Sequence, residues 1–237
     1  PVPATRINFF KLYRRSHTAF AGALGSGVVM GGFWGLGAIY ALGQTEEAGF
    51  VPTFIAANIL GGALAQYPIG MASDRIDRRY VLAALCAASG ISAFGLMLAE
   101  SKNSLLLGAF CFGAFANSLY AVSLAKAADN SAREEFVTIG SSVLLLSALG
   151  SASSSLVIGW AMRSLGDGAL FASLGLASFI TGVFIVLQPP GRTAVSIEEQ
   201  GAFIAATSAM APAAFDQDPR SDEAVEYEPT LADDGET

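Results

Sequence analysis

The chain has 237 residues, of which 53% are hydrophobic and only 14% are charged, and its formal net charge is −7. Ordinary soluble domains carry about 25% charged residues, so this composition argues against a water-facing surface and favours a membrane protein. The acidity is confined to one end. Residues 191–237 hold 11 acidic and 2 basic residues, whereas residues 1–190 hold 9 acidic and 11 basic residues.

The first segment, residues 1–18, contains "TRINFFKLYRRSHT", in which aromatic and basic side chains alternate just before an apolar run. A nucleic-acid-binding patch is one interpretation. A segment beside a membrane span is more simply explained as an interfacial segment that contacts anionic lipid headgroups. We therefore expect a cytoplasmic linker or interfacial segment here, with membrane lipid and no nucleic acid as its partner.

Six apolar runs follow, each long enough to cross a hydrocarbon core of about 30 Å, which needs about 20 helical residues. They cover residues 19–42, 50–72, 80–99, 104–126, 136–162 and 168–188. In lipid such a run must satisfy its own backbone hydrogen bonds, so it forms a helix. We predict an all-α polytopic membrane protein with a six-helix transmembrane bundle over residues 19–190. The acidic segment 191–237 has no sustained period and is predicted to be a disordered cytoplasmic tail.

Lysine and arginine are unevenly divided between the two sides of these spans. Lys102 and Arg163 lie on one side, and ten basic residues lie on the other: Arg6, Lys11, Arg14, Arg15, Arg75, Arg78, Arg79, Lys126, Arg133 and Arg192. Basic residues accumulate in cytoplasmic loops. We therefore expect both termini in the cytoplasm and a location in the cell (inner or plasma) membrane.

The turn between the second and third runs, "GMASDRIDRR" at residues 70–79, concentrates charge between two uncharged stretches. Gly70 lets a neighbouring helix approach closely, and Asp74 can accept hydrogen bonds from a helix N-terminus. Arg75, Arg78 and Arg79 can pair with carboxylates or lipid phosphates. One interpretation is a conformational gate built from these five residues. The alternative is a topology signal alone, which needs only the arginines.

A second charged cluster lies between the fourth and fifth runs. Its acidic members Asp129, Glu134 and Glu135 are possible partners of the arginines in residues 70–79. Such pairs would latch one conformation. The alternative is a solvated loop whose screened ion pairs contribute only about 0–1 kcal/mol each.

Small residues recur every four positions in two of the runs. The first carries Gly27, Gly31 and Gly35, and the fifth carries a matching series: Ser147, Ser151, Ser155 and Gly159. Stripes of small residues let membrane helices pack closely, so we predict that these residues form helix contacts.

Polar side chains inside the spans are few, and two interpretations stay open for each: a bond between helices, or contact with a substrate in a midplane cavity. The candidates are Asn58, Asn117, Gln66, Tyr40, Tyr120 and Trp34. The two asparagines lie nearest mid-span. Because no Asp, Glu, Lys or Arg lies in the middle of any span, the sequence favours a neutral or amphipathic substrate.

The sequence contains none of the catalytic motifs that we searched for. Cys86 and Cys111 lie in apolar runs without a CxxC motif or a nearby histidine, where cysteine behaves as a small hydrophobe. There is no HExxH, no P-loop, and no GxSxG with a triad. We expect no enzyme activity, no catalytic residue, no metal and no cofactor.

The stretch "GMASDRIDRR" resembles the G-x-x-x-D-[RK]-x-G-[RK]-[RK] loop of the major facilitator superfamily, with Asp77 where the second glycine is usual. A "DRxDRR" form occurs in a poorly characterised branch of transport proteins, which "GGALAQYPIG" and "AADNSAREEFV" also resemble; the likeness covers residues 5–190. That family has twelve helices in two halves.

The resemblance implies a secondary transporter of a small molecule that works by alternating access. The chain begins with proline and has six predicted spans. We therefore expect it to be the C-terminal half, with the N-terminal six-helix half of the same polypeptide as its partner. The alternative is a non-transporting membrane sensor or scaffold, or a six-helix assembly module.

Overall fold

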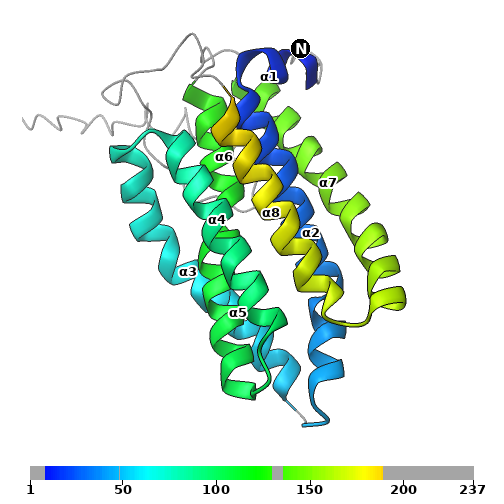
Figure 1. The fold of residues 1–237 in the computed structure, drawn as a ribbon. Helices are drawn as coiled ribbons and strands as arrows, with labels where there is room; N and C mark the ends of the chain where they lie inside the picture. The colour runs from blue at the N-terminus through cyan, green and yellow to red at the C-terminus, as the bar shows by residue number, and fades with distance from the viewer. Residues whose placement is uncertain (1–8, 48, 130–135, 189–237) are drawn as a thin grey trace, which may run out of the picture.

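The computed structural model describes residues 9–47, 49–129 and 136–188, and this part of the chain is all α-helical with no strand. A short helix α1 (Phe9–Arg15) precedes seven longer helices that run lengthwise in the bundle, with α6 continuing from the end of α5 (Figure 1). These are α2 (His17–Gln44), α3 (Phe50–Arg75), α4 (Arg78–Met97), α5 (Lys102–Ala116), α6 (Ser118–Asp129), α7 (Phe136–Leu165) and α8 (Ala169–Leu187).

Six segments of this bundle are long and apolar enough to cross a membrane, which confirms the predicted number. The fourth is built from α5 and α6 together, over Lys102–Asp129. The helices differ from the predicted runs by a few residues, because hydrogen bonding and caps end a helix while hydropathy only limits its lipid-embedded part. Thus α3 continues through Arg75, and the Oγ of Ser16 accepts the N–H of Ala19, so that α2 begins at His17. The predicted tail, residues 191–237, lies outside the described residues.

The turns are specified by local chemistry. Helix α5 begins with a capping box in which the N–H of Ser104 donates to the Oγ of Ser101 at 3.2 Å, and the N–H of Ser101 donates to the Oγ of Ser104 at 3.1 Å. Gly49 and Gly166, at the start of α3 and the end of α7, have φ angles of 94° and 90°. These left-handed conformations favour glycine, because a Cβ would be strained there.

A cluster of aromatic rings joins α2, α3, α5 and α8 in the interior. Phe33 lies 5.6 Å from Phe112 and 6.2 Å from Phe54 between ring centroids, and Tyr40 meets Phe171 edge-on at 4.8 Å. All five side chains are buried. Large apolar side chains such as Leu64, Leu156 and Ile180 point outward instead, which is expected of helices surrounded by lipid.

Helices α2 and α7 meet along the predicted stripe of small residues, which we call the glycine–serine seam (Gly27, Gly31 and Gly35 against Ser147, Ser151 and Ser155). A Cβ on Gly27 would collide with the backbone of Ser147, and one on Gly31 with the backbone of Ser151. The Oγ of Ser155 also donates to the carbonyl oxygen of Gly31 at 3.0 Å.

Gly159 is outside this close contact, because a Cβ there would meet only the Cδ2 of Leu36, at 3.9 Å. The reason lies in α2, where the position that continues the four-residue spacing after Gly35 is Ile39 rather than glycine. A second close seam, between α3 and α5, was not predicted. There Gly61 faces the carbonyl oxygen of Phe110, and Gly113 faces that of Asn58.

Candidate functional site

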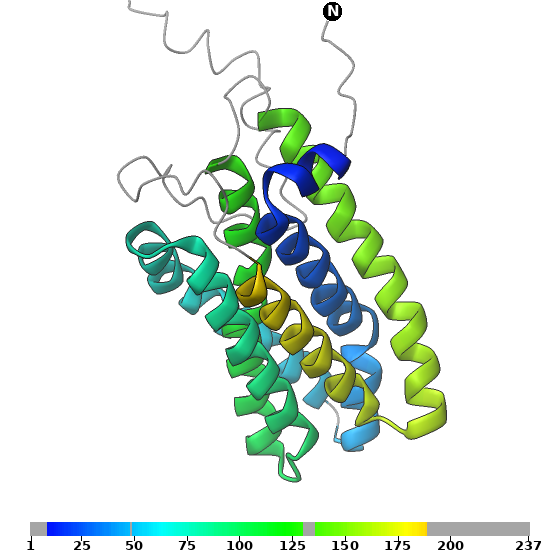
Figure 2. The same ribbon diagram turned by 45° about the horizontal axis from the view of Figure 1, so that its top comes forward.

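The turn between α3 and α4 lies at one end of the bundle, which we call the basic end. Figure 2 shows that α1, this turn, the end of α6 and the end of α8 gather there. Ile76 and Asp77 separate the two helices, and the Oδ1 of Asp77 accepts the N–H of Arg79 at 2.9 Å as the N-cap of α4. Arg78 and Arg79 therefore both lie in the first turn of α4, from which they reach different neighbours.

Arg78 reaches toward α6 and is 1% exposed. Its Nε donates to the Oγ of Ser73, its Nη1 to the carbonyl oxygen of Ala125, and its Nη2 to the Oδ1 of Asp74, each at 3.2 Å. Nη1 also donates to the carboxylate of Asp129, whose side chain is 3% exposed. A charge this deeply buried is tolerated because it is paired and hydrogen-bonded. Arg78 thus joins α3 and α4 to the end of α6.

Arg79 reaches in another direction, to the C-terminus of α8. Its Nε donates to the carbonyl oxygen of Ile185 at 3.1 Å, and its Nη2 donates to those of Val186, at 2.6 Å, and Gln188. The last carbonyls of a helix have no partner within it and carry the negative end of its dipole. Arg79 satisfies them and so ties α4 to α8.

Asp77 has a role of its own in addition to capping α4: its carboxylate lies 3.1 Å from the Nζ of Lys126 on α6. Burial raises the pKa of Asp77, but the N–H of Arg79 and the ammonium of Lys126 lower it more, so that the net pKa lies below the usual aspartate value. A lowered pKa stabilises the fold above the ordinary aspartate range, and this contribution is lost as pH falls through the lowered pKa. With φ of −53°, the position has no need of the glycine usual in the family loop.

Asp77→Ala is expected to lower the free energy of unfolding by about 1 kcal/mol, because the cap of α4 is lost. Asp77→Asn should cost less, since an asparagine oxygen still caps the helix. Thermal unfolding of the purified protein in detergent measures both. Equal losses for the two variants would show that the charge of Asp77, and not its capping oxygen, stabilises the turn.

The structure places the remaining predicted gate residues in different environments. Asp74 and Asp129 meet at Arg78, whereas Arg75 is exposed and Gly70 is buried within α3. Glu134 and Glu135 lie outside the described residues. Sequence reasoning missed the contacts of Ser73, which has no sequence signal, and the capping role of Asp77, whose signal was a helix-capping residue type shortly before the apolar run that begins at residue 80.

Three of the six predicted cavity residues donate hydrogen bonds to neighbouring helices. Asn58 is fully buried, and its Nδ2 donates to the carbonyl oxygen of Ala109 at 3.4 Å; the Nδ2 of Asn117 donates to the carbonyl oxygen of Asn58 at 3.3 Å. The OH of Tyr40 donates to the carbonyl oxygen of Leu96 at 3.3 Å. The two asparagines lie together at the break between α5 and α6, and their contact with a substrate stays a prediction.

The other three candidates differ from the asparagines in burial and surroundings. Tyr120 is buried in an apolar cluster that includes Leu12 and Ile139. Gln66 is half-buried on α3, and Trp34 is 52% exposed, with its ring edge-on to Phe33 at 5.6 Å.

A double-mutant cycle of Asn58→Ala and Asn117→Ala is expected to give a coupling energy of about 0.6 kcal/mol, the average for hydrogen bonds between membrane helices, and at most about 1.7 kcal/mol. Thermal unfolding in detergent measures this coupling energy. Gln66→Ala, on the same helix α3, takes the place of Asn58→Ala in the control cycle and shows the effect of simply adding a second mutation. Strictly additive losses would contradict an interaction between the two amides.

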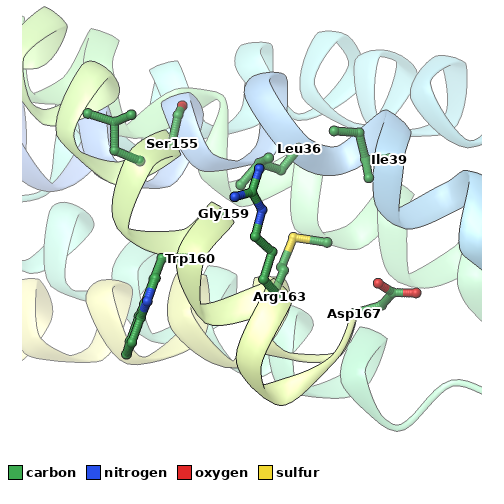
Figure 3. Close-up of a pocket in the computed structure, with 9 residues that line it drawn as sticks. Leu36, Ile39, Ser155, Gly159, Trp160, Arg163 and Asp167 are labelled. Carbon is green, nitrogen blue, oxygen red and sulfur yellow. The ribbon is translucent and has the colours of Figure 1, made fainter.

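A pocket of about 560 Å³ lies between α2 and α7, toward the end of the bundle opposite the basic end. Figure 3 shows Arg163, Trp160 and Asp167 around it, with Leu36 and Ile39 on the facing helix. Of the predicted site residues, only Ser155 and Gly159 line it. The pocket combines an aromatic ring with both signs of charge, and no sequence motif indicated it.

Six apolar membrane-crossing helices with a buried ionic cluster at one end define a polytopic integral membrane protein. The chain matches the family model described as Major Facilitator Superfamily over residues 18–221, and it therefore belongs to that superfamily. It is similar to proteins named uncharacterized MFS-type transporter YcaD from Salmonella arizonae (24% identical over 190 residues) and from Escherichia coli (25% over 190 residues). In both cases the match covers 80% of this chain and 49% of the relative, so the chain spans about half the length of these curated relatives.

Proposed function

We propose that this chain is the C-terminal half of a secondary active transporter that moves a small molecule across the cell (inner or plasma) membrane by alternating access. Membership of the superfamily and relatives named as transporters support transport, and the match to about half of each relative supports the assignment as a half. The excess of basic residues on one side of the spans supports cytoplasmic termini.

The ionic cluster at the basic end is the observation that carries the mechanism. Arg78 ties α3 and α4 to α6, and Arg79 ties α4 to α8. Helices joined in this way move together, and the aromatic cluster and the glycine–serine seam join α2 and α7 to them. We therefore expect the six membrane-crossing helices to rock as one body against a second body, as alternating access requires. The N-terminal six-helix half of the same polypeptide is the proposed second body.

Asp74 is the member of the cluster best placed to act as the gate. It bonds Arg78 at 3.2 Å, yet its side chain is 41% exposed. Its outer edge can therefore accept hydrogen bonds from a helix N-terminus of the second half in one conformation and release them in the other. Arg75 lies beside it on the exposed side of the turn. A neutral or amphipathic substrate fits the uncharged middle of the spans.

Transport is tested with the full-length protein in proteoliposomes that are incubated with a cell metabolite extract. Solutes retained after washing are identified by mass spectrometry against protein-free liposomes. Asp74→Asn is expected to reduce retention at least tenfold at equal protein content, because the gate bond is weakened, whereas Arg75→Gln, which also removes one charge from the turn, should retain most of it. Equal retention by Asp74→Asn and wild type would indicate that the turn acts only as a topology signal. Retention of no solute by the wild type would favour the sensor or scaffold interpretation.

A further inference from the structure

An apolar groove of about 250 Å³ runs between α4 and α8, apart from the pocket between α2 and α7. Small residues form its floor: Ala83, Ala87 and Gly182. A Cβ on Gly182 would lie 3.0 Å from the Cβ of Cys86, so the two helices approach closely along this line. Phe179, Val183, Val186 and Leu187 complete the lining.

The groove opens on an apolar surface. Val183, Val186 and Leu187 are 55%, 57% and 75% exposed. Farther along the same two helices, Ile91 and Ile180 are also exposed. A surface of this composition on a membrane-crossing segment faces hydrocarbon rather than water, so the groove is open to lipid chains.

A cation lies at the basic end of the groove. Arg79 is one helical turn before Ala83 on α4, and its guanidinium donates to the carbonyl oxygen of Val186, so both groove walls lead to it. In the described part of the chain its partners are carbonyl oxygens, and none of the salt bridges there uses it. Among the described residues, its guanidinium is thus bonded to carbonyl oxygens, and it acts on the carboxylate of Asp77 only through charge, without a salt bridge. Tyr80, 64% exposed, follows it, as is typical of a residue at the level of lipid headgroups.

We propose that this groove binds one acyl chain of an anionic phospholipid, with the lipid phosphate against Arg79. An open apolar channel that ends at a guanidinium matches the two parts of such a molecule, a hydrocarbon chain and a phosphate that arginine binds well. The lipid would fill the space between α4 and α8 and strengthen the contact that Arg79 makes with the end of α8. The inference does not depend on transport.

The test is native mass spectrometry of the full-length protein in detergent, titrated with phosphatidylglycerol and, separately, with phosphatidylcholine of the same chains. Wild type is expected to retain phosphatidylglycerol at least fivefold more tightly than phosphatidylcholine. Ala87→Leu, which fills the groove, should weaken binding of both lipids at least fivefold. Ala84→Leu, the same change at an exposed position of α4 outside the groove, should leave both unchanged.

Arg79→Gln should abolish the preference for phosphatidylglycerol, and Arg79→Lys, which keeps the charge, should retain part of it. Three results would overturn the proposal. The first is unchanged lipid binding in Ala87→Leu. The second is equal affinity of wild type for the two lipids. The third is that Ala87→Leu loses a co-purifying protein rather than lipid, because the groove would then be a protein-binding surface.

Discussion

Arg78→Ala is expected to lower the free energy of unfolding by about 3–5 kcal/mol, the usual cost of removing one partner of a buried ion pair. For a chain of this size that corresponds to a fall in melting temperature of about 6–20 °C. The loss is large because the side chains of Arg78 and Asp129 are 1% and 3% exposed, so water cannot replace the guanidinium at the carboxylate. Thermal unfolding of the purified protein in detergent measures the effect.

Two variants make this result specific. Arg75→Ala removes the same charge from an exposed position of the same turn and should change the melting temperature little. The double variant Arg78→Ala/Asp129→Asn should recover part of the lost stability, because the second change neutralises the buried carboxylate. Failure of Asp129→Asn to restore any stability would contradict the ion pair as the cause.

Gly31→Val is expected to destabilise the protein by about 3 kcal/mol, at the upper end of the cost of overpacking. The new Cβ would collide with the backbone of Ser151, which can yield only if α2 and α7 separate. Separation would also break the 3.0 Å hydrogen bond from the Oγ of Ser155 to the carbonyl oxygen of Gly31. Thermal unfolding in detergent again provides the measurement.

Two other glycines give matched controls for the same substitution. Beyond the adjacent backbone of its own helix, Gly95→Val places its Cβ where no atom lies within 4 Å, and Gly159→Val meets only Leu36, at 3.9 Å. Both should leave the melting temperature nearly unchanged. A comparable loss in Gly159→Val would show that the seam extends beyond Gly35, contrary to the structure.

Much of the fold could be predicted because its signals are local. Each span satisfies its own backbone hydrogen bonds, so length and hydropathy were sufficient to predict all six. The matching series of Gly27, Gly31 and Gly35 with Ser147, Ser151 and Ser155 indicated a close packing surface on both helices. The sequence also has no glycine in register with Gly159, because the corresponding position is Ile39. This could be recognised only once α2 was known to be the partner of α7.

The candidate site was only partly predictable. Gly70, Asp74 and the arginines were recognised as a set from their spacing, but their different partners were not. Asp129 was one of three candidate acids, and nothing in the sequence distinguished it from Glu134 or Glu135. The burial of Tyr40 in an aromatic cluster, and its bond to Leu96, likewise depend on which helices surround α2.

The sequence by itself determined six membrane-crossing helices, a charged turn between the second and third, and an end of the bundle rich in basic residues. Only the tertiary structure decided that Arg78 pairs with Asp129 across 51 positions of the chain, and that Arg79 reaches Ile185 across 106. The physical reason is that lipid-facing helices have similar apolar surfaces, so composition does not specify neighbours. Neighbours are chosen by close contact between backbones and by a few buried hydrogen bonds, which exist only after the helices have packed.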